Sequence, residues 1–235
     1  MEHADSTHAL KDDEIHVLER SLMGAAGQLG SLARTIEDRI MHLGFKAPEL
    51  IDGAASDTAV KMRDKNMTSI SFQDVTQDLQ TLVEVEVNEI IELLQGTALK
   101  AVQEVLHVGR ALKRSGLPNE NEVVSLVRDA PRFEFPPVAG SVELNYWKFL
   151  GHRVIRGRLL RALQSTIQPL FRKQLRDYSA ALGAWSKATI QDMQFSVESY
   201  ADGYRSALQE MSQSRDSTSD AAQIQEDIAM LTTTD

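Results

Sequence analysis

One segment of this sequence is basic and contains no acidic residue. From Lys148 to Arg176 there are eight Lys/Arg and no Asp or Glu, although the 235 residues carry a formal net charge of −9. The rest of the chain keeps 17 of the 25 basic residues against all 34 acidic ones. Charge segregation of this kind predicts an electrostatic partner, which is an anionic membrane, an acidic protein or the chain's own acidic helices.

The basic segment has the pattern of an amphipathic helix. On a wheel of 100° per residue, one arc holds the apolar residues Phe149, Leu159, Leu163, Ile167 and Leu170. A second arc holds Arg158, Arg161, Arg172 and Arg176. An arginine face with aromatic residues beside it suits an anionic membrane surface. The predicted membrane or partner surface consists of Tyr146, Trp147, Phe149, Leu150, Arg153, Arg156, Arg158, Arg161, Arg172, Lys173 and Arg176.

Two other partners for the basic segment stay open. Its arginines can pair within the chain with glutamates of the second long helix, which are Glu84, Glu86, Glu89 and Glu92. Nucleic acid ranks last, because the overall charge is acidic and no Gly-rich or aromatic-interleaved RNA signature accompanies the arginines.

Residues for catalysis or metal binding do not form a recognisable constellation. The chain has no cysteine, and its histidines, at positions 3, 8, 16, 42, 107 and 152, include no pair at helical metal-ligand spacing. No G-x-x-x-x-G-K-[ST] sequence is present to bind a nucleotide phosphate. We therefore predict a non-enzymatic protein that uses no cofactor and no metal.

The N-terminal sequence bears on location. MEHADSTHALKDDE is polar and acidic, whereas a secretory signal starts basic and continues apolar. No segment approaches ~18 uninterrupted apolar residues, the length a membrane-spanning helix needs. We expect a cytoplasmic protein whose membrane contact, if any, is peripheral and at the inner face.

Composition and apolar spacing predict an all-α fold. There are only six prolines and 6% aromatic residues, and apolar residues recur at helical spacing. We expect an elongated bundle of long amphipathic helices in a single domain, 12–211, between a flexible N-terminus, 1–11, and a disordered tail, 212–235. The expected helices cover about 13–43, 69–115, 120–129, 145–168 and 170–211, and a proline-rich extended segment covers 131–144.

Three apolar stripes carry this prediction. The stripe over 15–43 alternates steps of three and four residues, and the stripes over 79–112 and 171–211 have mean steps of roughly 3.7 and 3.6 residues, the period of a nearly straight helix. Pro169 lacks a backbone N–H and should interrupt the last helix close to Gln168. The polar stretch 46–68 is typical of a connection that contains one short helix at most.

The stretch from Pro131 to Met211 resembles the C-terminal helical part of bacterial dynamin-like large GTPases. The likeness rests on PRFEFPP, the pair Tyr146 and Trp147, the basic sequence RVIRGRLLRAL and a long helix with regularly spaced large residues, which are Tyr178, Leu182, Trp185, Phe195 and Tyr204. It covers about a third of the chain. It implies a stalk-like bundle that assembles with its own copies or with a partner GTPase and approaches membranes. The GTPase domain of that family is missing, so its nucleotide-binding half is expected to be encoded elsewhere, unless the likeness reflects only long amphipathic helices.

A shorter stretch resembles chemotaxis phosphatases that act on phosphorylated response regulators. SFQDVTQDLQ is similar to one of their helix segments, and LGSLARTIEDRIMHLGF to their first helix. In that family an acidic residue is followed four positions later by a glutamine that orients the attacking water. Here the residue four positions after Asp74 is Asp78, and the glutamines are off register. The alternative phosphatase site consists of Asp74, Gln77, Asp78 and Gln80.

The sequence thus predicts a helical assembly module that meets itself, a separately encoded dynamin-like GTPase or an anionic membrane. The alternative is a chemotaxis-type regulator or phosphatase of a response regulator.

Overall fold

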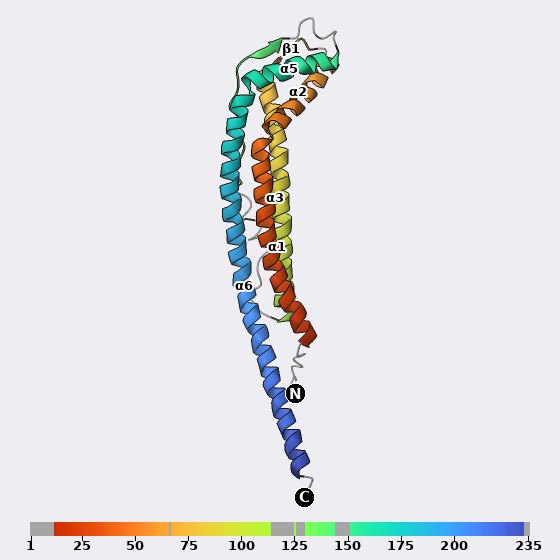
Figure 1. Cartoon of the computed structure of the whole chain (residues 1–235), viewed down its shortest axis with the longest axis vertical. Helices are drawn as coiled ribbons and strands as arrows, with labels where there is room; N and C mark the ends of the chain where they lie inside the picture. Colours follow the sequence, from red (N-terminus) through yellow and green to blue (C-terminus); the bar gives the residue numbers. More distant parts are fainter. Residues whose placement is uncertain (1–11, 66, 114–124, 126–129, 144–150, 233–235) are drawn as a thin grey trace, which may run out of the picture. The chain divides into compact units, whose positions relative to one another are not determined.

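Over the residues that the structure describes, the protein is all-α apart from one pair of short strands. The computed structural model describes residues 12–65, 67–113, 125, 130–143 and 151–232. Its elements in chain order are α1 (Asp12–Phe45), α2 (Ala47–Asp64), β1 (Ser69–Ser71), α3 (Phe72–Ala111), β2 (Ser141–Glu143), α5 (His152–Thr166) and α6 (Gln168–Thr232) (Figure 1). The all-α prediction is confirmed at this level.

The chain divides into two compact units. The first unit contains 1–30, 97–124 and 192–235, and the second contains 31–96 and 125–191. Helices α1, α3 and α6 are each continuous and contribute residues to both units. The single domain expected over 12–211 stays a prediction.

The apolar stripes of the three long helices supply most of the buried side chains. The predicted stripe is buried throughout 15–43 in α1 and throughout 79–108 in α3. Over 171–208 in α6 it is buried as well, except at Trp185 and Tyr200, which are partly exposed. The helical period read from the sequence therefore identified the core-facing side of each long helix.

A small antiparallel sheet precedes α3. β1 pairs with β2, and Ser69 lies opposite Glu143. The pairing continues for one more bond, in which the backbone N–H of Phe72 donates to the carbonyl oxygen of Gly140 over 2.9 Å. The helix that the sequence placed from residue 69 therefore begins at residue 72, because the residues before it are paired as a strand.

α2 corrects the prediction for the stretch 46–68. Instead of a connection, residues 47–64 form a helix of 18 residues. Pro48 lies in its first turn, where the missing N–H removes no intrahelical bond. Half of its buried residues are alanine, so its apolar period was weak: Ala47, Leu50, Ile51, Ala54, Ala55, Thr58, Ala59 and Met62.

The last helical region is broken where the sequence predicted. α5 ends at Thr166 and α6 begins at Gln168, beside Pro169. α6 then continues to Thr232, so residues 212–232 are helical within the stretch where a disordered tail was expected, and residues 233–235 lie outside the described residues. Extending an existing helix adds one hydrogen bond per residue without a new nucleation step, so a polar tail can remain helical.

Other predicted segments fall partly or wholly outside the described residues. These are the flexible N-terminus, 1–11, and the helix expected over 120–129, of which only Ser125 is described. In the expected extended segment, residues 130–140 have no regular secondary structure and lead into β2.

Replacement of Gly140 by a residue with a side chain is predicted to destabilise the fold. The φ of Gly140 is +120°, and a Cβ atom there would lie 2.9 Å from Cδ2 of Phe72. Gly140→Ala should therefore lower the free energy of unfolding by roughly 1–3 kcal/mol, measured by urea denaturation followed by helical circular dichroism. The control is Gly157→Ala in α5, where nothing lies within 4 Å and an increase of about 0.5–1 kcal/mol is expected. Equal stability of Gly140→Ala and the native chain would contradict this account.

Candidate functional site

α5 exposes arginines because its apolar face is packed on another helix. Its buried residues are Ile155, Leu159 and Leu163. α5 packs against α2, and in Figure 1 both helices cross the direction of α3 and α6 within the second unit. The exposed basic residues of α5 are Arg153, Arg158 and Arg161. No Asp or Glu occurs in α5 to offset them.

Arg156 lies at the contact between α5 and α2. Its Nη2 atom donates hydrogen bonds to both carboxylate oxygens of Asp52, each over 2.6 Å. The two side chains are 40% and 45% exposed, so this ion pair contributes at most about 1 kcal/mol. Arg156 was predicted as part of the partner surface, and its guanidinium is instead engaged with α2.

The basic surface continues on the first turns of α6. Its residues there are Arg172, Lys173 and Arg176, and all three are exposed. The break between the helices changes the register predicted for one continuous helix. Phe171 is fully buried and Leu170 is 49% exposed, whereas the wheel placed Leu170 on the apolar face. We call the six exposed residues of α5 and α6 the basic surface: Arg153, Arg158, Arg161, Arg172, Lys173 and Arg176.

Two glutamates proposed as intramolecular partners of the arginines have other cations. Lys46 Nζ donates to both carboxylate oxygens of Glu86 over 2.7 Å. Arg39 Nη1 lies 3.9 Å from a carboxylate oxygen of Glu89. These two residues of α3 therefore have cations of α1 and of the residue before α2 as neighbours, and the pairing of the basic helix with glutamates of α3 stays a prediction.

The aromatic part of the predicted surface lies outside the described residues. It consists of Tyr146, Trp147, Phe149 and Leu150. The chain re-enters the described structure at Gly151, whose φ is +84°, immediately before α5. By sequence these residues are thus next to the basic surface.

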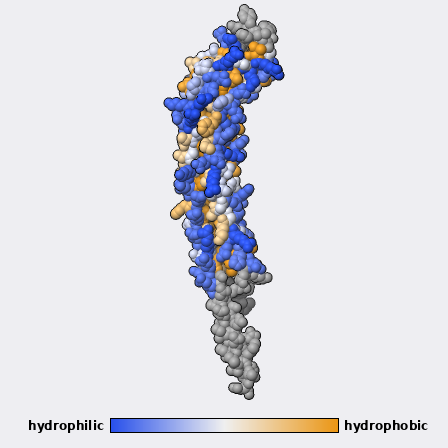
Figure 2. Space-filling model, in the orientation of Figure 1, coloured by the Kyte–Doolittle hydropathy of each residue, from blue (hydrophilic) through white to orange (hydrophobic). Residues whose placement is uncertain are grey.

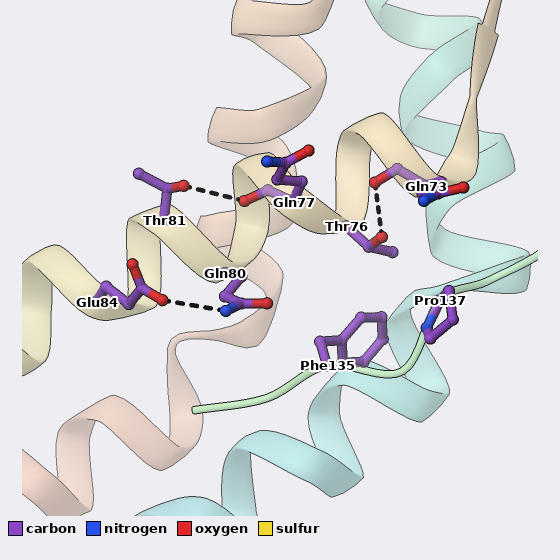
Figure 3. A pocket seen from close by; sticks show the side chains of 8 residues that line it. All are labelled: Gln73, Thr76, Gln77, Gln80, Thr81, Glu84, Phe135 and Pro137. Carbon is purple, nitrogen blue, oxygen red and sulfur yellow. Dashed lines mark hydrogen bonds between the residues drawn. The ribbon is translucent and has the colours of Figure 1, made fainter. Parts of the chain in front are cut away.

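A shallow polar pocket of about 420 Å³ is lined in part by the segment that resembles a chemotaxis phosphatase (Figure 3). It is lined by Gln73, Thr76, Gln77, Gln80, Thr81, Glu84, Phe135 and Pro137. Gln80 donates a hydrogen bond to Glu84 over 3.1 Å. Asp78 accepts two hydrogen bonds from Lys61 Nζ, over 2.9 and 2.8 Å. Of the four predicted phosphatase residues, Gln77 and Gln80 therefore line the pocket, whereas Asp74 and Asp78 do not.

Beside this pocket, the extended segment is fixed to α6 by aromatic side chains. Phe133 and Phe135 stack with their ring centroids 6.5 Å apart, and both meet Phe171 edge to face. The hydroxyl of Tyr178 donates to the carbonyl oxygen of Pro131 over 2.9 Å. Burial, with a smaller effect of the Glu84 charge, raises the pKa of Tyr178 to about 12.

Within the described residues, no group of His, Asp and Glu is arranged to hold a metal ion. No helix in the same part of the chain is long and apolar enough to cross a membrane. No protein-family model, no curated protein and no solved structure matches the chain.

The raised pKa of Tyr178 predicts that the folded chain loses stability at alkaline pH. This pKa is higher in the folded chain than the ordinary value of 10, so the neutral phenol stabilises the fold below pH 10. This contribution should disappear between about pH 10 and 12, and two pKa units correspond to about 3 kcal/mol at most. Tyr178→Phe should therefore lose less stability over this pH range than the native chain, in urea denaturation at each pH.

The control for general alkaline effects is Tyr200→Phe, at a partly exposed tyrosine of the same helix. A native chain and a Tyr178→Phe variant whose stabilities fall in parallel from pH 10 to 12 would show that the phenol is not responsible.

Proposed function

We propose that this chain is a non-enzymatic, stalk-like assembly module that attaches to anionic membranes through the basic surface of α5 and α6. The observation that carries the proposal is that all six of these Lys/Arg residues are exposed on helices whose apolar faces are already buried. The site of action would be the inner face of the cytoplasmic membrane.

The location of the charges supports a partner outside the chain. Within the described residues, Arg153, Arg161, Arg172 and Lys173 make no ion pair with an Asp or Glu. Each Lys or Arg close to an anionic bilayer contributes about 1 kcal/mol of binding, whereas an exposed ion pair within the protein contributes less. A lipid surface is therefore a stronger partner for these side chains than the glutamates of α3.

The negative charge of the rest of the chain would orient the protein on an anionic membrane. Outside the basic segment the formal charge is strongly negative, so an anionic membrane repels most of the molecule while it attracts the basic surface. The acidic parts of the chain would then be kept from the lipid and be available to copies of the chain or to a separately encoded dynamin-like GTPase. This assembly role follows from the resemblance of 131–211 to that family.

Neutralising the basic surface should abolish membrane binding. We expect the combined variant Arg153→Gln, Arg161→Gln, Arg172→Gln and Lys173→Gln to lose sedimentation with phosphatidylglycerol vesicles, at nearly unchanged melting temperature. Binding of the native chain should weaken steeply between low and physiological salt, where the Debye length falls to about 8 Å.

A matched control removes four exposed cations elsewhere, with Arg20→Gln, Arg34→Gln, Arg110→Gln and Lys187→Gln. This control should still sediment with the vesicles. If the native chain does not bind such vesicles even at low salt, or if both variants lose binding equally, the membrane proposal fails.

A response-regulator partner is the second candidate function, and the pocket at the start of α3 favours it. Gln77 is exposed at the pocket, and its amide could meet a receiver domain. Asp78, which stands where that family has its glutamine, is held by Lys61.

The phosphatase alternative predicts that the chain accelerates loss of phosphate from a phosphorylated receiver domain. Gln77→Ala should remove the acceleration, while Gln191→Ala, at an exposed glutamine of α6, should not. Release of inorganic phosphate is the measurement. No acceleration with any receiver domain encoded beside this chain would exclude the activity.

A further inference from the structure

The last turns of α1 carry two large apolar side chains that the core does not use. Met41 is 60% exposed and Phe45 is 66% exposed, whereas Leu43 between them is buried. Residues four apart lie on the same face of a helix, so Met41 and Phe45 form one apolar pair. On the face shown in Figure 2, apolar side chains reach the surface as patches among hydrophilic ones.

The ring of Phe45 adjoins the basic surface. The guanidinium carbon of Arg176 lies 6.0 Å from the centroid of the ring, within cation–π range. Arg172 precedes Arg176 by one turn and therefore lies on the same face of α6. An aromatic side chain from α1 thus joins cations from α6, although the two are far apart in the sequence.

Close packing fixes this arrangement. A Cβ atom at Gly44 would lie 2.8 Å from the Ser179 hydroxyl oxygen, so the backbone at the end of α1 is held directly against α6. One turn along each helix, a Cβ at Gly183 would meet Ile40 at 3.8 Å. Phe45, next to Gly44, therefore has a defined position beside Arg176.

We propose that Phe45, with Met41 beside it, is an apolar anchor that inserts into an anionic bilayer while Arg172 and Arg176 bind the lipid phosphates. This inference rests on the proposed membrane function and names its inserting residue. Phosphates lie above the acyl chains in a bilayer, so an exposed ring with the guanidinium group of Arg176 over it, and Arg172 one turn away, offers an apolar group and cations to the two layers together. An acidic protein partner would supply the charge but no apolar layer beneath it.

Vesicle binding of an alanine variant gives the first test. Phe45→Ala should bind phosphatidylglycerol vesicles about tenfold more weakly than the native chain, because one aromatic side chain no longer inserts. Any binding that persists in about 1 M salt, where charges are screened, should be lost. Phe195→Ala is the control: Phe195 is 77% exposed in the first unit, and its replacement should change nothing.

Depth of insertion gives the second test. The sequence contains no cysteine, so Phe45→Cys and Phe195→Cys each provide a single labelling site in the full chain. An environment-sensitive fluorophore at position 45 should shift to shorter wavelength on vesicles and be quenched by brominated acyl chains. The same label at position 195 should do neither.

The outcomes separate the two proposals. Native binding that Phe45→Ala leaves unchanged, with no quenching at position 45, overturns the anchor but leaves the membrane function in place. Absence of native binding overturns both. A label at position 45 that becomes buried without vesicles, together with a doubled molar mass in light scattering, assigns the patch to a contact between copies and also overturns the anchor.

Discussion

The packing of α5 on α2 is the contact on which the α5 part of the basic surface depends. A helix of 15 residues has little intrinsic stability in water, so α5 exists because Ile155, Leu159 and Leu163 are buried. Once that face is used, the rest of the helix must meet solvent. The arginines are exposed as a result of this packing, and the Asp52–Arg156 pair adds a polar contact at the same place.

Much of the fold was predictable because large apolar residues repeat over many turns. The stripes of α1, α3 and α6 each contain many such positions, and a long register leaves little ambiguity. α2 was missed because alanine at positions 54, 55 and 59 gives a weak apolar signal around Gly53. β1 was missed because its partner strand is remote in the sequence, which no local pattern records.

The location of the charges in the candidate site was predictable from the sequence, but the arrangement of the side chains was not. Counting residues located the basic segment, but one wheel drawn through Pro169 placed Leu170 on the wrong side, because the helix restarts there. The partners of Glu86 and Glu89 come from α1 and from Lys46, and only the folded chain brings them together. Phe45 lies off the apolar stripe, and its contact with Arg176 likewise depends on tertiary structure.

The pairing of β1 with β2 has a consequence for the order of folding. This pairing closes a loop that contains all of α3 and the segment after it. The chain therefore loses the entropy of loop closure before the few hydrogen bonds between the strands can stabilise it. Helices form from local contacts on a much shorter timescale. The strands should therefore pair late, after α3 has formed, and the start of α3 should be among the last parts of the chain to acquire protection from hydrogen exchange during refolding.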